Sequence, residues 1–477
     1  MIDLLPPSTI EINWALCKIG DEGVAKFVKS CKVVISKKMI LDKLTILNLS
    51  FNNISDDGVR SIAETVFKNL KELDLSCNLI GKNGGKVLGE NLTMKFPKLK
   101  ILQLKHNYLG DEGLKFLCES LEANFMLETV DLGCNHFGSQ GAVALANLLN
   151  KNGRFQNISI AMNYIGEEGL KALTTVLSDS RMRNDFRLRE LDLSGLGCLK
   201  EKNSSAHEWI AEMLENNNTL TSLSLASNFM GKKGTAVVME GLQVNRTITS
   251  IDLSYNNIGP QGIQAVAAVL EGGSLTSVDL TANSIGKEGM EHLIEAVCAN
   301  QFLEDLNVSF NNIQSGCNNL WKLASSKTSL RFLNLSNNNL GKEGTFQIAQ
   351  NLPNSKIEVL MLNENNIGDE GASVIAASLT NNPSSLKELH LSTNNIGQQG
   401  LLTLLEAIRG NQRQDDSFQF SNMNSGMEKR NSFSVKNQRP VASKLQLVDL
   451  RENAVPERGE IPLLIDRINV EHEIVVL

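Results

Sequence analysis

The sequence predicts an α/β solenoid built from about 15 copies of one unit, a short β-strand followed by a turn and an α-helix. Three observations predict it: an alternating apolar segment recurs along the chain, an asparagine follows it at a near-constant distance, and a segment with helical apolar spacing comes next. One such unit cannot bury its own apolar faces, so neighbouring copies must stack. The 477 residues are therefore expected to form one elongated domain.

Residues 248–270, ITSIDLSYNNIGPQGIQAVAAVL, show the unit clearly. Ile251 and Leu253 alternate with polar residues, as in a strand with one buried face. Apolar residues then recur at helical spacing from Ile263 onward. Asn256 lies between the two patterns, where its side-chain amide can both donate to and accept from the backbone of a sharp turn.

The unit recurs along nearly the whole chain, and an asparagine ends each copy of the apolar pattern L-x-x-L-x-L-x-x-N. Between Asn228 and Asn394 successive copies are separated by 28, 27, 28, 27, 27 and 29 residues. Two further copies have Cys17 and Leu196 in place of the asparagine. We call these residues the marker asparagines; they are Asn52, Asn78, Asn107, Asn135, Asn163, Asn228, Asn256, Asn283, Asn311, Asn338, Asn365, Asn394 and Asn453.

A second motif, I-G-x-x-G, opens several of the predicted helices. It reads IGDEG at 19–23, IGPQG at 258–262 and IGDEG at 367–371. With this turn, the repeat length and the asparagine, the chain resembles leucine-rich-repeat proteins of the ribonuclease-inhibitor-like class. The resemblance implies a horseshoe with a parallel concave sheet and convex helices. It implies little about function, because members inhibit nucleases, activate a GTPase, sense ligands or hold complexes together.

The spacing of the marker asparagines divides the chain. From Asn394 to Asn453 there are 59 residues, about 30 more than one repeat needs, and the extra residues are rich in Asn, Ser and Gln without an apolar period. We therefore expect an N-terminal cap with a divergent first repeat at 1–43, regular repeats at 44–410, a disordered insertion loop at 411–440, and the last repeat with a C-terminal cap at 441–477.

Two insertions could carry function. The segment 178–187 is either a tolerated surface insertion or a loop that presents Arg181, Arg183 and Arg187 to an acidic partner. Ser432, in the sequence KRNSF, is either part of a plain solvated loop or a phosphorylation site resembling those of basophilic kinases.

Bulk composition excludes several classes of partner. With 46 basic and 53 acidic residues the net charge is −7, so neither a nucleic acid nor an anionic membrane is expected as a partner. The opening MIDLLPPSTI lacks a basic start and an apolar core, so it does not resemble a secretory signal. No apolar run approaches the roughly 18 residues of a membrane helix. The oligomeric state is not predicted.

Cysteine positions favour a reducing compartment. Cys77 and Cys134 occupy equivalent places two repeats apart, which puts them roughly 10 Å apart, beyond the reach of a disulfide. Reduced thiols indicate the cytoplasm. Within it, a ciliary or cytoskeletal complex, immune-type sensing and a bacterial effector translocated into a host cell all remain open.

Catalytic motifs are missing from the sequence. Five Gly-Lys pairs occur, but none is followed by Ser or Thr as in a phosphate-binding loop. The six histidines show no H-E-x-x-H spacing, and no Cys/His zinc cluster is present. We therefore expect no catalytic residues, no metal site and no cofactor, and a protein that is not an enzyme.

The outward positions of the predicted strands form the candidate binding surface. Four residues before the marker, six of fourteen positions are Asp, and Ser recurs two residues before it. Either this is the favoured filling of the repeat, or it forms an acidic, serine-lined trough that attracts a basic protein partner. The acidic candidates are Asp74, Asp131, Asp252 and Asp279.

Bulky residues on this surface are candidate anchors, because interface energy concentrates in aromatic and arginine side chains. Phe310, Phe332 and Met361 come from three successive repeats and would form an apolar patch if they share the inner face. Alternatively, a residue directly before the marker turns sideways into the core. The further candidates are Phe51, His106, Tyr255, His390 and Arg451.

These observations favour a non-enzymatic scaffold that binds a protein through its concave face and insertion loops. One alternative is a GTPase-activating protein of the Ran-GAP type, although the acidic tail typical of those proteins is missing. Another is a ribonuclease inhibitor, although eight cysteines are few for that class.

Overall fold

The computed structural model describes residues 8–33, 40–179, 186–200, 205–381, 385–410, 445–453, 460–472 and 475–476. They belong to two compact units, unit 1 (Met1–Asn283) and unit 2 (Ser284–Leu477). The insertion at 411–440 with Ser432, and the arginines Arg181 and Arg183, lie outside the described residues.

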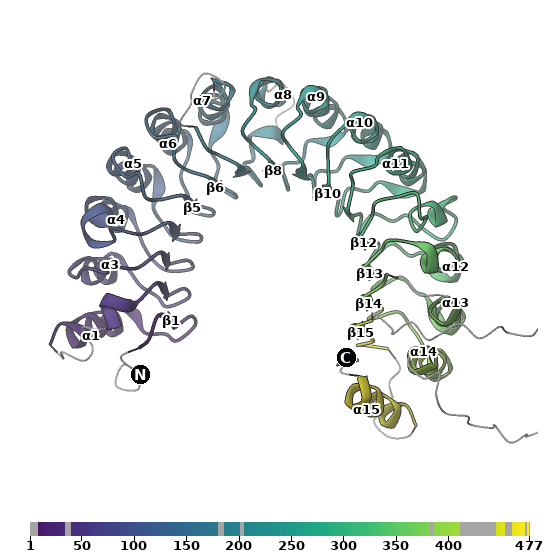
Figure 1. Ribbon diagram of the computed structural model, residues 1–477. Coiled ribbons are helices and arrows are strands. Elements are labelled where there is room, and N and C mark those ends of the chain that lie inside the picture. The colour runs from purple at the N-terminus through teal and green to yellow at the C-terminus, as the bar shows by residue number, and fades with distance from the viewer. Residues whose placement is uncertain are drawn as a thin grey trace, which may run out of the picture. The chain divides into compact units, whose positions relative to one another are not determined.

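Unit 1 contains ten short strands that pair in parallel, each with the next along the chain and in register. Helices connect them on one side of the sheet (Figure 1). The strands are β1 (Glu11–Asn13), β2 (Ile46–Asn48), β3 (Glu72–Asp74), β4 (Ile101–Gln103), β5 (Thr129–Asp131), β6 (Asn157–Ser159), β7 (Glu190–Asp192), β8 (Ser222–Ser224), β9 (Ser250–Asp252) and β10 (Ser277–Asp279). The helices are α1 (Gly20–Val33), α3 (Asp56–Ala63), α4 (Lys82–Lys95), α5 (Gly110–Leu121), α6 (Ser139–Lys151), α7 (Gly166–Ser178), α8 (Ala206–Asn216), α9 (Gly231–Val244) and α10 (Gly259–Gly272), with the 3-10 helix η3 (Cys198–Lys200).

Unit 2 continues the same repeat, with a 3-10 helix where one repeat would have its α-helix. Its strands also pair in parallel and in register. They are β11 (Asp305–Asn307), β12 (Phe332–Asn334), β13 (Val359–Met361), β14 (Glu388–His390), β15 (Leu447–Asp449) and β16 (Val475–Val476). The helices are α11 (Gly286–Ala299), η4 (Leu320–Lys322), α12 (Gly341–Ala349), η5 (Leu352–Asn354), α13 (Gly368–Asn381), α14 (Gln398–Gly410) and α15 (Glu460–His472). The predicted parallel strand-turn-helix solenoid is confirmed within each unit.

The core of each unit lies between its strands and its helices. The middle residue of a strand points into this core, as Ile251 of β9 does, and the residues on either side of it are half-buried on the inner face of the sheet. Leu253 and Leu280, just after their strands, are fully buried. From the helix side, Ile263 and Val266 of α10 complete the core, as the helical spacing predicts.

The marker asparagines join neighbouring repeats. Asn256 is fully buried, and its Nδ2 donates to the carbonyls of Leu225, Leu253 and Ser254 at 2.8, 3.0 and 3.2 Å. Its Oδ1 accepts from the backbone of the preceding repeat. At position 196 a buried leucine replaces the asparagine, and the glycines on both sides of it have positive φ. The side-chain ladder is therefore interrupted there, as the sequence predicts.

The residues that flank the markers form a tight turn, which we call the rim. Many of them have positive φ although they are not glycines, including Phe51, Tyr255 and Phe310 directly before the marker. These three side chains are about half exposed. The left-handed backbone thus brings these side chains partly to the surface, and none of the three is fully buried in the core.

Candidate functional site

The acidic positions of the inner face have a local structural role. Oδ1 of Asp74, Asp131, Asp252 and Asp279 accepts a hydrogen bond from the backbone N–H two residues further on, at 2.8, 2.9, 2.9 and 2.8 Å. Each carboxylate thus holds the start of its own turn, as aspartate does in Asx turns. This contact leaves the second oxygen of each carboxylate for other partners.

Four of the acidic side chains come together in an open hollow on the inner face of unit 1. The hollow has a volume of about 480 Å³, and none of its lining residues is basic. Asp131, Glu190, Asp192 and Asp252 supply its negative charge. The other lining residues are Gln103, Thr129, Val130, Asn157, Ile158, Ser159, Leu191, Ser194, Ser222 and Ser224. We call this feature the acidic hollow.

A chain of hydroxyl contacts crosses the acidic hollow from one strand to the next. Ser159 Oγ donates to Asp192 Oδ2 at 2.9 Å, and Ser194 Oγ contacts the other oxygen of Asp192. Ser194 Oγ also lies 2.7 Å from Ser224 Oγ, which lies 3.0 Å from Asp252 Oδ2.

The chain of hydroxyl contacts has fewer hydroxyl protons than oxygen–oxygen contacts. The path from Asp192 through Ser194 and Ser224 to Asp252 has three oxygen–oxygen contacts, but the two serines have one hydroxyl proton each. While both carboxylates are ionised, one contact therefore lacks a hydrogen. An ammonium or guanidinium group from outside could supply that hydrogen and neutralise the charge.

Burial makes the negative charge of the hollow costly to the isolated protein. It raises the pKa of the Asp131 carboxyl above its ordinary value, and the charge of Asp192 acts in the same direction. The Gly133 N–H and the charge of Lys105 oppose this rise only in part. A cation placed in the hollow would lower the pKa of Asp131 again.

In unit 2 the predicted apolar patch is divided. Phe332 opens β12 and Met361 ends β13, where Met361 pairs with Asn334 in the register, so the two are diagonal neighbours on the inner face. Both are half-buried. Phe310 lies instead in the rim after β11. A shared patch of all three residues is therefore wrong, because Phe310 is five register positions further along its repeat than Phe332.

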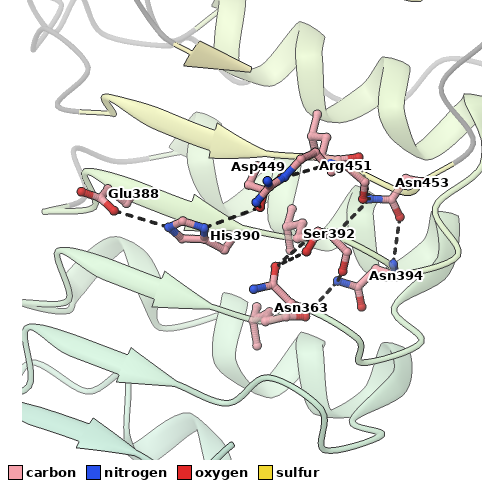
Figure 2. A network of polar contacts seen from close by, with 11 residues as sticks. Asn363, Glu388, His390, Ser392, Asn394, Asp449, Arg451 and Asn453 are labelled. Carbon is pink, nitrogen blue, oxygen red and sulfur yellow. Dashed lines mark hydrogen bonds and ion pairs between the residues drawn. The ribbon is translucent and has the colours of Figure 1, made fainter. Parts of the chain in front are cut away.

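His390 and Arg451 belong to a polar network at β14 and β15 of unit 2 (Figure 2). His390 lies 3.4 Å from Glu388 Oε2 and 3.8 Å from Asp449 Oδ2. Arg451 donates from Nε and Nη2 to the two oxygens of Asp449, at 2.9 and 2.8 Å. Asp449 is only 2% exposed, and burial alone would raise its pKa. The hydrogen bonds and the charge of Arg451 together outweigh burial, so the pKa of Asp449 is lowered.

The remaining candidates lie on exposed surfaces. His106 is an exposed rim residue with positive φ, like Phe51 and Tyr255. Arg187 is exposed, and its backbone N–H donates to Gly153 O at 2.8 Å. Among the serines two residues before a marker, Ser194 lines the acidic hollow although it is buried. The others that are buried are Ser50, Ser76, Ser254, Ser309 and Ser336.

Sequence reasoning missed Glu190, Ser222 and the hydroxyl chain. Glu190 and Ser222 are the first residues of their strands and face the same side as Asp192 and Ser224, two residues later. The period of two along a strand could have identified them.

Comparison with known proteins agrees with this architecture. The model of the leucine-rich-repeat family (LRR_6, described as Leucine Rich repeat) matches ten segments of the chain, namely residues 43–63, 68–89, 97–118, 123–146, 244–267, 274–293, 299–316, 326–349, 354–376 and 382–405. The chain is a leucine-rich-repeat solenoid. No curated protein matches this leucine-rich-repeat sequence.

Solved structures similar to this leucine-rich-repeat protein are remote in sequence. The yeast complex of Rad7 and Elc1 gives 15% identity and a TM-score of 0.47, covering 80% of this chain and 85% of the matched one. A TLR13–ssRNA13 complex gives 17% and 0.44, covering 88% of this chain and 57% of the matched one. An internalin from Listeria monocytogenes gives 20% and 0.42, covering 89% and 100%. The chain thus spans little more than half of the TLR13 chain.

The described residues contain neither a membrane-spanning helix nor a metal-binding cluster. Across the ranges given above, no helix is both long and apolar enough to span a bilayer. In the same part of the chain, no group of three or more His, Cys, Asp or Glu side chains is arranged to hold a metal ion.

Proposed function

We propose that this protein is a non-enzymatic interaction scaffold of the ribonuclease-inhibitor-like class, and that the acidic hollow binds basic side chains of a protein partner. The hydroxyl chain that ends on Asp192 and Asp252 carries this proposal, since it lacks one proton. A lysine or arginine would provide the missing hydrogen and offset the repulsion among the four carboxylates.

The rigidity of the strands that line the hollow favours binding of a partner over catalysis. Strands β4 to β9 supply all the lining residues except Ser194, which follows β7, and their backbone is held in register by the parallel ladder. A partner would therefore meet a pre-formed surface and pay little for ordering it. The acidic lining favours a basic protein over a nucleic acid, whose phosphates it would repel.

We place the scaffold in the cytoplasm. Cys77 and Cys134 are half-buried thiols, and burial raises the pKa of both, which suits a reducing compartment. Membership of a ciliary or cytoskeletal complex, or action as a translocated effector, would each be consistent with such a surface.

Site-specific photocrosslinking tests this function. A photoreactive amino acid at Ser222, which lines the hollow, should capture a basic protein partner in cells, whereas the same group at the exposed Glu240 of α9 should not. The purified partner should then bind Asp192→Asn/Asp252→Asn about tenfold or more weakly than wild type.

The matched control variant also removes two negative charges, but it removes them from helices instead of from the hollow. Glu212→Gln/Glu240→Gln removes two exposed carboxylates from α8 and α9 and should leave the affinity within about twofold. Equal affinities of wild type and the hollow variant for the captured partner would refute the proposal. Asparagine keeps the Oδ1 acceptor of both turns, so the hollow variant should fold normally.

A further inference from the structure

An exposed apolar row runs along the rim of unit 1. Its members all directly follow a marker asparagine. Leu79, Tyr108, Tyr164 and Phe229 are 47%, 57%, 80% and 58% exposed, and His136 is exposed as well. We call these five residues the rim row.

Other repeats show that the fold does not require these side chains. The position after the marker is Asn53 or Asn257 elsewhere in unit 1, and Asn312, Asn339, Asn366 and Asn395 in unit 2, all with positive φ. Asparagine tolerates the left-handed region better than a bulky side chain does. His136 and Phe229 adopt it all the same, at φ 60 and 55. His136 and Phe229 therefore carry a conformational cost, and because both are exposed they recover little of it through burial. Leu79, Tyr108 and Tyr164 do not have positive φ.

Leu79, Tyr108, His136 and Tyr164 come from four successive repeats, whereas Gly197 stands between Tyr164 and Phe229. Backbone hydrogen bonds continue the sheet ladder into the rim, as from His106 N to Gly133 O at 2.9 Å, so equivalent residues of adjacent repeats stand about 5 Å apart. The rings of Tyr108 and His136 stack with centroids 5.3 Å apart and planes 11° apart.

Glycine in the next repeat leaves room for the row. A Cβ on Gly197 would come within 2.9 Å of the Tyr164 ring, and the φ of this glycine is 78. The Tyr164 ring therefore lies beside Gly197, with no side chain of that residue to cover it. An exposed aromatic row of this kind is typical of a binding surface.

The acidic hollow lies on the same repeats. It is lined from β4 to β9, and the turns after β4, β5, β6 and β8 carry Tyr108, His136, Tyr164 and Phe229. A segment that places a basic side chain in the hollow therefore has the rim row within its reach. Phosphates would meet the carboxylates of the hollow, which disfavours a nucleic acid stacked on the same rings.

We propose that the rim row and the acidic hollow together bind one extended segment of a protein partner. Its lysine or arginine side chains enter the hollow, and its apolar side chains, proline or aliphatic, lie on the rings of the row. This inference rests on the proposed function of the hollow and adds the apolar half of the recognised sequence.

Selection of a displayed library of random 14-residue peptides for binding to the full chain tests the rim-row inference. Enriched peptides should combine basic with apolar residues. Tyr108→Asn/His136→Asn/Tyr164→Asn should weaken their binding about tenfold or more, as for central aromatic anchors, measured by fluorescence anisotropy. This variant should fold, since asparagine occupies the same position in other repeats. Phe125→Asn/Phe302→Asn, which removes two exposed aromatics from other loops, should bind like wild type.

The tyrosines provide a direct reporter. The chain has three, and Tyr108 and Tyr164 belong to the row whereas Tyr255 does not. In 3-fluorotyrosine-labelled protein, the bound peptide should shift the fluorine resonances of Tyr108 and Tyr164 more than that of Tyr255. Single Tyr→Phe variants assign the three signals.

The outcomes separate this inference from the function on which it rests. If peptides bind the row variant normally but lose affinity for Asp192→Asn/Asp252→Asn, the rim-row inference is overturned and the hollow stands. If only the row variant loses affinity, the hollow takes no part in binding these peptides, and the inference that row and hollow bind one segment is overturned. Failure to enrich any peptide overturns the rim-row inference alone, because crosslinking at Ser222 tests the hollow independently.

Two other occupants of the row would also overturn the inference. A second copy of the chain would make the fluorine shifts depend on protein concentration without peptide, and the row variant would abolish dimers in sedimentation. A single-stranded oligouridine probe that bound wild type and lost affinity for the row variant would show nucleic acid recognition instead.

Discussion

Replacing Asn256 by alanine should destabilise unit 1 by about 2–6 kcal/mol, because the change leaves two buried backbone donors without an acceptor at about 1–3 kcal/mol each. Oδ1 of Asn256 accepts from Asn228 N at 3.1 Å and from Met230 N at 3.3 Å. Both residues are buried, and no other acceptor contacts either N–H.

The variant also loses the hydrogen bonds from Asn256 Nδ2 to three carbonyls, but this loss should destabilise the protein much less. Each keeps a second donor after the substitution: Leu225 O from Asn228 Nδ2 at 3.0 Å, Leu253 O from Asn283 Nδ2 at 2.9 Å, and Ser254 O from Ser227 N at 2.8 Å. The expected loss therefore comes mainly from the two orphaned donors.

Urea unfolding followed by circular dichroism measures this loss. The control is Asn257→Gly, the neighbouring exposed residue at φ 54, which should change the free energy of unfolding by less than about 1 kcal/mol because glycine accepts this backbone conformation. A loss below about 1 kcal/mol for Asn256→Ala would refute the view that the marker asparagines hold neighbouring repeats together.

Three further predictions concern the core, the last described repeat and the thiols. Leu253→Ala should cost about 2–5 kcal/mol in the same unfolding assay, since Leu253 is fully buried; a loss below about 1 kcal/mol would contradict its place in the core. Arg451→Met should weaken hydrogen-exchange protection of β15 at pH 7. Because Arg451 lowers the pKa of Asp449, its stabilisation is present above the ordinary carboxyl pKa and is lost as pH falls through the lowered pKa of the folded protein, so the difference between the two proteins should shrink in acid; equal protection at pH 7 would contradict the pairing. With Ellman's reagent at pH 8, the exposed Cys17 should react first, and Cys317, whose pKa burial raises to about 12, only after unfolding; fast reaction of Cys317 in the native protein would contradict its burial.

The repeat architecture could be predicted because local sequence patterns determine it. Ile251 and Leu253 alternate with polar residues, Asn256 follows at a fixed distance, and the helical period then begins at Ile263. Each pattern fixes a backbone conformation independently of distant residues, and repetition multiplies the signal. The helix missing after β11 was not predicted, because residues 313–324 keep apolar residues that a 3-10 helix can bury equally well.

The candidate site could be predicted only in part. The aspartates at the last position of each strand were recognised, and Asp131 and Asp252 do line the acidic hollow. The hydroxyl chain depends on distances between side chains of different strands, which no single repeat contains. The rim row is visible in the sequence once repeats are compared, since Tyr108 and Tyr164 stand where other repeats have asparagine.

The salt dependence of affinity for the partner captured at Ser222 tests the central claim most directly. If basic side chains enter the acidic hollow, raising the salt concentration from about 50 to 300 mM should weaken wild-type binding by on the order of tenfold. Asp192→Asn/Asp252→Asn should bind weakly at low salt and respond much less to added salt. Equal salt dependence of the two proteins would contradict the account, because the charges of the hollow would then contribute nothing to recognition.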